Sequence, residues 1–278
     1  MTLHCPVSNR TRNSNSSDHK HLKTIWQAGG VVLNGWLHIP SSYSAELMAH
    51  EAWDSLTVDM QHGPIDYQVA VTMLQAISTT DTVPLARVPW NEPGIIMKML
   101  DAGCYGIICP MVNSRTEAEA FVGACRYPPQ GYRSHGPNRA LLYGGKDYPL
   151  QANEHVITMA MIETAQALNN LDDILSVPGL DAIYVGPSDL GRSLGEKPQM
   201  DVTTGPVAEA IDTIVAACKK HNIVAGLHTG SAEYALKMYE KGFQFASISS
   251  DARLLTAQVG QTIAKVKKTE VSAATGPY

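Results

Sequence analysis

Two acidic residues in this sequence follow apolar stretches closely: Glu163 comes after Val156–Ile162, and Asp189 comes after Ala182–Gly186. If these stretches are neighbouring strands, the two carboxylates would repel each other unless a cation lay between them. Mg²⁺ and Mn²⁺ prefer oxygen ligands of this kind, with water and substrate oxygens completing the coordination shell. The alternative is that each residue caps a helix or short turn. The spacing alone leaves both interpretations open.

A second group of candidates begins with Asp59 and His62, three residues apart at the end of the stretch Ser55–Asp59. A carboxylate near an imidazole can set its tautomer and raise its basicity, so His62 is a candidate general base. The chain contains ten His, and a solvated loop residue is the plain alternative. His38 and His228 also stand at the ends of apolar stretches and are secondary candidates.

Arg87 lies near the end of the apolar stretch Val83–Val88. A guanidinium that points inward there needs an anionic partner, because burying it unpaired is costly. That partner would be either a ligand carboxylate or enolate oxygen, or a structural Asp. A further candidate is the turn Gly186-Pro187-Ser188-Asp189, whose backbone N–H groups could converge on an anion.

The elements that would position these residues alternate along the chain. Short β-branched stretches predict strands, and the amphipathic segments between them predict helices. Alternation of this kind indicates a parallel sheet covered on both faces, and eight repeats in ~250 residues is the size of a TIM (β/α)8 barrel. A doubly wound open sheet is the alternative. The expected strands are Val31–His38, Ser55–Asp59, Val83–Val88, Tyr105–Met111, Val156–Ile162, Ala182–Gly186, Ile223–Leu227 and Gln244–Ile248.

The helices are predicted from their amphipathic spacing and their first residues. Pro93 follows a possible cap at Asn91 or Glu92, and Ser114 with Glu117 forms a possible capping box. Between the fourth and fifth strands, the segment Tyr127–Glu154 is long and rich in Gly, Pro and Tyr. It would be either a lid or binding loop, lining the far side of the pocket, or part of an oligomer interface. The expected helices are Tyr67–Ile77, those opening at Pro93 and Ser114, Gly205–Lys220, Ser231–Lys241 and Asp251–Lys268.

The composition limits the class of protein. With 278 residues, 44% of them hydrophobic, the chain can form one large domain, and we place that domain at residues 24–270. Residues 1–23 are expected to be a disordered polar leader, with a transit peptide as alternative, and residues 271–278 a flexible tail. The net charge of −5, without a basic block, gives no indication of nucleic acid or membrane binding. Five scattered Cys favour reduced thiols and a cytoplasmic location.

Several kinds of chemistry lack their residues. No Lys ends a predicted strand, so a Schiff-base mechanism has no candidate. No G-x-G-x-x-G follows a strand, and neither a P-loop nor a G-x-S-x-G elbow is present. None of these kinds of chemistry is therefore expected.

Six segments in order carry a resemblance to a known family: VDMQHGP, PLARVPWNEP, IICPMVNS, RYPPQGYRSHGP, MIETAQALNN and YVGPSDLGRSLG. Together they resemble the HpcH/HpaI family of class II 2-oxo acid aldolases, over roughly residues 25–268. The resemblance implies an aldehyde-lyase that cleaves a 4-hydroxy-2-oxo acid to pyruvate and an aldehyde, or condenses the two. It also implies a hexamer, a trimer of dimers that exchange their last helix.

The resemblance also implies a role for each candidate residue. Glu163 and Asp189 would bind Mg²⁺, Mn²⁺ or Co²⁺, which would chelate pyruvate. Arg87 would contact the keto oxygen, and His62, supported by Asp59, would be the acid/base. Asp101 matches a position that reaches a neighbouring subunit's site, whereas Gln61 stands where Glu is commoner. The substrate-binding set is Trp36, Arg87, Gly186, Pro187, Ser188 and Asp189.

Two other functions are compatible with such a barrel. A lyase acting on a citramalyl- or malyl-coenzyme A thioester would need a basic groove for the nucleotide, and few Lys stand near the predicted rim. A non-catalytic barrel that senses a 2-oxo acid would bind its ligand without turnover.

Overall fold

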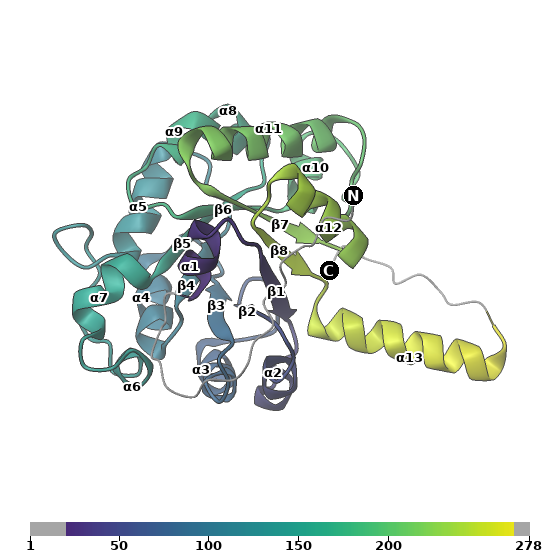
Figure 1. Cartoon of the computed structure of the whole chain (residues 1–278), viewed down its shortest axis with the longest axis horizontal. Helices are drawn as coiled ribbons and strands as arrows, with labels where there is room; N and C mark the ends of the chain where they lie inside the picture. Colours follow the sequence, from purple (N-terminus) through teal and green to yellow (C-terminus); the bar gives the residue numbers. More distant parts are fainter. Residues whose placement is uncertain (1–20, 270–278) are drawn as a thin grey trace.

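Eight strands form a closed barrel in which each strand is parallel to the next along the chain, and β8 closes onto β1 (Figure 1). The computed structural model describes residues 21–269, so most of the expected leader and all of the expected tail lie outside it. The eight predicted strands and the TIM barrel are confirmed. The strands are β1 Val32–Leu37, β2 Ser55–Asp59, β3 Val83–Arg87, β4 Gly106–Cys109, β5 Ile157–Ile162, β6 Ala182–Val185, β7 Val224–Thr229 and β8 Phe245–Ile248.

The helices begin where their capping residues predict. Glu92 accepts the backbone N–H groups of Gly94 and Ile95 at the start of α4, and Ser114 accepts that of Glu117 at the start of α5. Short helices α8 and α9 divide the segment after β5. The helices are α1 His21–Gln27, α2 Ser42–Ala49, α3 Tyr67–Ile77, α4 Pro93–Ala102, α5 Arg115–Cys125, α6 Ala140–Gly144, α7 Tyr148–His155, α8 Ala165–Asn169, α9 Leu171–Leu175, α10 Pro187–Ser193, α11 Pro206–His221, α12 Ala232–Lys241 and α13 Asp251–Lys267.

The barrel interior is filled with large side chains. Trp36, Tyr184 and Phe245 belong to one buried cluster, and the rings of Trp36 and Tyr184 stack with their centroids 5.6 Å apart. Helix α1 adds Leu22 and Trp26 to this cluster, and Trp26 Nε1 donates to the Gln244 carbonyl just before β8. Helix α1 therefore closes the barrel at the amino ends of the strands, which leaves the carboxyl ends for the polar residues.

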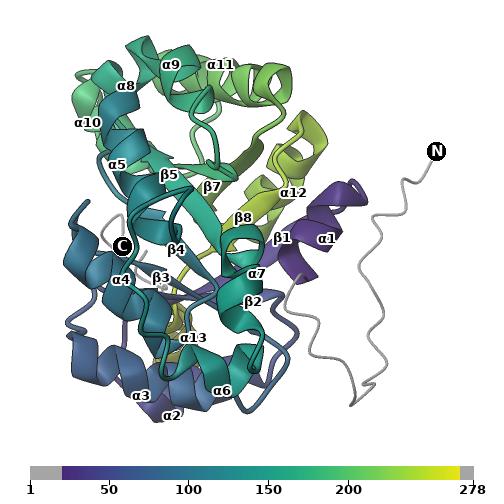
Figure 2. The ribbon, with the colours of Figure 1, turned by 90° about the vertical axis from the view of Figure 1, so that its left-hand side faces the viewer.

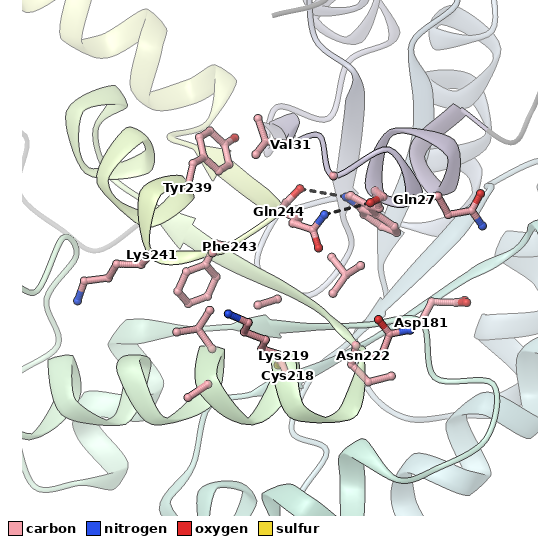
Figure 3. A pocket seen from close by; sticks show the side chains of 18 of the residues that line it. Gln27, Val31, Asp181, Cys218, Lys219, Asn222, Tyr239, Lys241, Phe243 and Gln244 are labelled. Atoms are coloured by element: carbon pink, nitrogen blue, oxygen red, sulfur yellow. Dashed lines mark hydrogen bonds between the residues drawn. The ribbon is translucent and has the colours of Figure 1, made fainter. Parts of the chain in front are cut away.

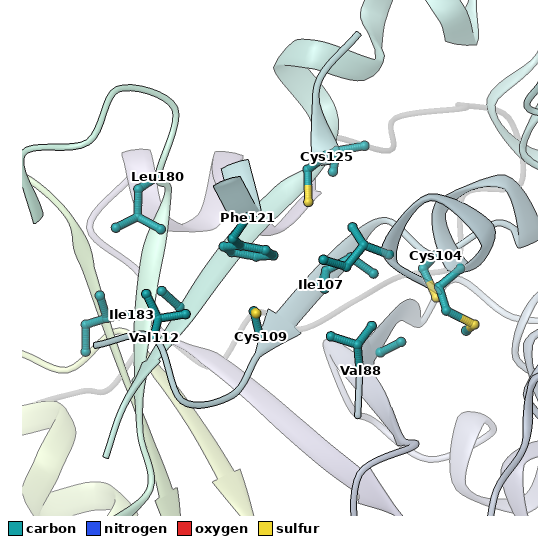
Figure 4. Close-up of a cluster of buried hydrophobic side chains, with 14 of the residues drawn as sticks. Val88, Cys104, Ile107, Cys109, Val112, Phe121, Cys125, Leu180 and Ile183 are labelled. Carbon is teal, nitrogen blue, oxygen red and sulfur yellow. The ribbon is translucent and has the colours of Figure 1, made fainter. Parts of the chain in front are cut away.

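A second, larger apolar layer lies between the strands and the surrounding helices. Figure 4 shows part of it, where Ile107 and Cys109 of β4 face Phe121 of α5. Cys104, Cys109, Cys125 and Cys218 are free and buried. Within residues 21–269, no helix combines the length and apolar character needed to cross a membrane.

The segment 127–154 is not a lid over the carboxyl ends of this chain's barrel. It connects α5 to β5, and a helix-to-strand connection lies at the amino ends of the strands. It contains α6 and α7, with α6 against α4 (Figure 2) and the carbonyl of Glu154 2.7 Å from Lys23 Nζ of α1. The expectation that it lines the far side of the pocket is therefore wrong within one subunit. The loops at the site of a barrel follow the strands, whereas this segment follows a helix and precedes β5.

Helix α13 projects away from the barrel as an arm (Figure 1). Its buried residues are only Asp251, at its root, and Ala264. The Asp251 carboxylate accepts the backbone N–H groups of His38 and Ile39 and the hydroxyl of Ser44, so the root is fixed to the loop after β1. Leu255, Val259 and Ile263 recur every fourth residue and are exposed, which forms an uncovered apolar stripe.

Removing the Trp26 side chain of α1 should destabilise the barrel. We expect Trp26→Ala to lower the free energy of unfolding by about 3–5 kcal/mol, because it leaves a cavity at the amino end of the barrel. Leu150→Ala is the control, since Leu150 is 83% exposed and its loss should change stability by less than about 0.5 kcal/mol. Urea unfolding followed by circular dichroism measures both, and equal values for the two variants would contradict the role of α1.

Candidate active site

Asp59 is the centre of a buried network at the carboxyl end of β2. Arg87 stands opposite it in the register of β2 and β3, and donates to its two carboxylate oxygens through Nε at 2.8 Å and Nη2 at 2.6 Å. His38 Nε2 lies 2.7 Å from Asp59 Oδ2, and Trp36 Nε1 donates to the same oxygen at 3.2 Å. The structural partner considered for Arg87 is thus present.

The carboxylate–imidazole pair expected at Asp59 forms with His38. His62 reaches Asp59 through its backbone N–H, at 3.4 Å. Burial by itself would raise the pKa of Asp59, but hydrogen bonds from His38 and Arg87 and the charge of Arg87 hold this pKa well below its usual range. Asp59 is therefore ionised at neutral pH and serves to orient Arg87 and His38.

Glu163 lies directly after β5 and is 2% exposed. Its Oε1 accepts the backbone N–H of Met111 at 2.7 Å, and Met111 has a left-handed backbone with φ 56°. Its Oε2 lies close to Gly186, where an added Cβ would come within 2.6 Å and would displace this carboxylate oxygen. The pKa of Glu163 is raised to about 7 by burial, the largest cause, and by the negative charge of Asp189, against the opposing effects of the Met111 N–H and Arg87.

Asp189 lies in the first turn of α10, and its negative charge acts on Glu163. The charge of Asp189 disfavours the ionised form of Glu163, and a divalent cation between the two carboxylates would remove this repulsion. Among the described residues, no group of three His, Cys, Asp or Glu side chains could hold an ion. Two carboxylates, with substrate and water oxygens in the other positions, are a donor set that fits Mg²⁺ or Mn²⁺.

His62 is exposed on the rim. Partial burial and the charge of Arg87 lower the pKa of His62, while Asp59 and Asp189 raise it less. The balance favours the neutral imidazole, which can accept a proton. The side chain of neighbouring Gln61 has a buried Oε1 without a hydrogen-bond partner among residues 21–269.

A narrow pocket opens beside this network. Three of its residues, Met161, Tyr184 and Met200, are not among the site residues predicted from the sequence. Met200 belongs to the loop between α10 and α11, and Asp201 fixes this loop by accepting the Gly230 N–H at 2.7 Å and the Ser231 hydroxyl at 2.6 Å. No strand-end signal marks Met200, because only folding brings this loop to the rim. The pocket is lined by Arg87, Met161, Tyr184, Gly186, Pro187, Ser188, Met200 and His228.

Two expected site residues lie elsewhere. Trp36 is fully buried below the pocket, where it stacks on Tyr184 and carries Arg87 over its ring at 4.8 Å. Asp101 is near the end of α4, at the amino ends of the strands, where Arg133 Nη2 donates to it at 2.7 Å. It is therefore at the opposite end of the barrel from Arg87 of the same subunit.

A larger groove, of about 920 Å³, lies at the amino end of the barrel between α1, α11 and α12 (Figure 3). Its walls include Gln244, Lys219 and Asp181. It lacks the paired carboxylates and the Arg87 network, so the small pocket at the carboxyl ends is the better candidate for catalysis despite its size.

The buried Asp59–Arg87 pair makes a testable contribution to stability. We expect Asp59→Asn to lower the free energy of unfolding at pH 7 by about 3–5 kcal/mol, because Arg87 loses its counter-charge. Since the folded-state pKa of Asp59 is depressed, its contribution is present above pH ~4 and is lost as the pH falls below that value.

The difference between wild type and Asp59→Asn should therefore shrink in acid, as measured by urea unfolding at a series of pH values. Asp212→Asn, which removes an exposed partner of Lys241, is the control and should show no such change. A difference that stayed constant down to pH ~3 would contradict the assignment.

Comparison with known proteins agrees with the barrel fold and identifies the family of the chain. Residues 34–257 match the family described as HpcH/HpaI aldolase/citrate lyase. The chain is 41% identical over 246 residues to a hydroxypyruvate/pyruvate aldolase of Rhizorhabdus wittichii, covering 88% of this chain and 98% of that protein. It is 34% identical over 264 residues to a 4-hydroxy-2-oxo-heptane-1,7-dioate aldolase of Salmonella dublin, covering 92% and 98%.

Among solved structures, an HpcH/HpaI aldolase/citrate lyase family protein from Burkholderia cenocepacia superposes with a TM-score of 0.83 at 29% identity. That match covers 89% of this chain and 99% of the other. The family match spans most of the barrel, and the sequence relatives are matched over nearly their whole length. The chain is an aldolase of the HpcH/HpaI family.

Proposed function

We propose that this chain is a divalent-metal-dependent aldolase that cleaves a 4-hydroxy-2-oxo acid into a pyruvate-type 2-oxo acid and an aldehyde, and catalyses the reverse condensation. The observation that carries the proposal is the buried Glu163, coupled to Asp189 and next to Arg87 on the rim. The relatives named for pyruvate, hydroxypyruvate and a 4-hydroxy-2-oxo acid support this substrate class.

Glu163 and Asp189 would hold the ion, Mg²⁺, Mn²⁺ or Co²⁺. When bound, a divalent ion supplies a Lewis acid that polarises the keto group of the 2-oxo acid. Glu163 is prepared for this by the Met111 N–H, which fixes one oxygen and leaves the other facing Gly186. The Gly186–Asp189 turn would hold the substrate carboxylate through the N–H groups of Ser188 and Asp189, at the start of α10.

Arg87 would stabilise the negative charge that develops on the keto oxygen. Its position does not depend on substrate, because Asp59 holds it through two hydrogen bonds and Trp36 lies against its guanidinium. Such preorganisation is what makes a charge-stabilising group effective, since it need not reorient during the reaction.

His62 would act as the general base. In the cleavage direction it takes the proton of the 4-hydroxyl; the C3–C4 bond breaks, the hydroxyl carbon becomes the aldehyde carbonyl, and the electron pair passes into the enolate of the 2-oxo acid. The proton then returns from His62 to C3, which completes the product. The lowered pKa of His62 keeps the imidazole neutral and able to accept this proton near pH 7.

The α13 arm supports a second part of the proposal, an oligomer that exchanges this helix. In a barrel of this kind the last helix would cover the sheet between α12 and α2. In this chain α13 projects away instead, and α12 and α2 leave Leu236, Tyr43 and Leu47 exposed. The stripe of Leu255, Val259 and Ile263 on a partner's α13 would cover this gap, and the partner would receive the same contact in return. A hexamer built from such dimers, in the reducing cytoplasm, is the assembly we propose.

The metal site is tested by Glu163→Gln and Asp189→Asn. We expect each to abolish Mn²⁺ binding, measured by calorimetry, and to lower pyruvate release from 4-hydroxy-2-oxo acids by roughly 10²–10³-fold. A chelator should abolish wild-type turnover, and Mg²⁺, Mn²⁺ or Co²⁺ should restore it. Glu119→Gln, at an exposed ion pair with Arg115, is the matched control and should behave as wild type.

Wild-type turnover in either ligand variant would show that the site is misplaced. Binding of pyruvate by the wild type without any turnover would instead favour a 2-oxo acid sensor. Activity on a coenzyme A thioester alone would favour the thioester lyase.

The arm is tested by Val259→Asp combined with Ile263→Asp. We expect this variant to dissociate in sedimentation velocity, because two charges on the apolar stripe cannot be buried in an interface without a large cost. Gln261→Asp, on the opposite face of the same helix, is the control and should leave the assembly unchanged. An intact oligomer in the double variant would exclude helix exchange through this stripe.

A further inference from the structure

The candidate pocket contains two polar side chains, Tyr184 and His228, that pyruvate does not account for, and they are hydrogen-bonded to each other. The proposed function assigns the substrate carboxylate to the turn at Ser188 and the keto oxygen to Arg87. Met161, Met200 and Pro187 present apolar surface. His228, at the carboxyl end of β7, remains. Burying the polar atoms of its imidazole against the methyl group of a ligand would cost free energy.

The surroundings hold the His228 ring in one place. Its Nδ1 lies 2.7 Å from the Tyr184 hydroxyl, and the Trp36 ring meets it edge-on with centroids 5.0 Å apart. Trp36 and Tyr184 are themselves stacked inside the barrel. The ring is thus as rigid as the barrel core beneath it, which suits a group that discriminates between ligands.

The ring is also uncharged. Burial and the positive charge of Arg87 lower the pKa of His228 to about 3, against a smaller opposing effect of Asp59. A neutral imidazole offers one N–H and one lone pair. With Nδ1 engaged by Tyr184, Nε2 is left without a hydrogen-bond partner among the residues that the structure describes, and it is either a donor or an acceptor depending on the tautomer.

A ligand hydroxyl matches this atom in both tautomers, because a hydroxyl both donates and accepts. A carboxylate accepts only and is better served by a cation, and a methyl group would leave Nε2 desolvated and unpaired. The nearest chemical variant of pyruvate with such a group carries a hydroxyl on C3.

We propose that His228, oriented by Tyr184, selects 2-oxo acids with a hydroxyl on C3, of which hydroxypyruvate is the simplest, over pyruvate. The inference rests on the proposed function for the place of the carboxylate and keto group. It adds a specificity residue that the reaction itself does not need, since His62, Arg87 and the carboxylates complete the chemistry.

The test compares hydroxypyruvate with pyruvate in wild type and His228→Phe, which keeps a flat ring against Trp36 but removes both nitrogens. Two readouts are used with Mn²⁺ present: the dissociation constant of each acid from calorimetry, and the rate of deuterium exchange at C3 followed by NMR. We expect wild type to favour hydroxypyruvate, and the ratio between the two acids to fall by about five- to tenfold in His228→Phe.

Tyr184→Phe/His228→Phe covers the case in which the single variant folds poorly because the Tyr184 hydroxyl loses its partner. It should show the same loss of ratio. His221→Phe, a His-to-Phe change at the end of α11 beside Asp172, is the control and should keep the wild-type ratio.

An unchanged ratio in His228→Phe, or a proportional loss for both acids, overturns the proposal. The binding ratio decides this even if the wild type proves to have no aldol turnover. If the wild type has no aldol turnover, only the proposed function fails. If pyruvate release is normal but His228→Phe keeps the wild-type ratio between the two acids, only the role of His228 is excluded.

Discussion

The ion pair between Asp59 and Arg87 is the interaction on which the rim of this barrel depends. The two residues stand side by side in the register of β2 and β3, and both are buried. An unpaired charge at either position would be strongly destabilising, so each requires the other. Because Asp59 also binds His38 and the Trp36 indole, one carboxylate of β2 sets the positions of groups at the ends of the two neighbouring strands, β1 and β3.

On the opposite side of the site, the negative charges of Glu163 and Asp189 repel each other. Glu163 is buried against Gly186, and its pKa is raised chiefly by this burial and also by the negative charge of Asp189. The Met111 N–H and the charge of Arg87 offset only part of this effect. The Asp59–Arg87 ion pair on one side of the site and the Glu163–Asp189 carboxylate pair on the other are the basis of the proposed binding of a cation together with an anionic substrate.

The proposed catalytic site and the proposed assembly surface lie in different parts of the barrel. Helix α1 seals the amino ends with Trp26, the polar groups occupy the carboxyl ends, and α13 leaves the body of the domain. Asp251 links the last two features, because it anchors the root of α13 to the backbone of His38.

The sequence by itself determined the eight strands, the barrel and most of the helix starts, because hydrophobic periodicity and capping residues act locally. It also determined that Asp59, Arg87, Glu163 and Asp189 would share one rim, since the carboxyl ends of parallel strands meet at one end of a barrel. Only the tertiary structure decided that Asp59 pairs with His38, that residues 127–154 lie at the far end, and that Met200 reaches the pocket. These depend on side-chain direction and on contacts between distant segments, which no local pattern in the sequence records.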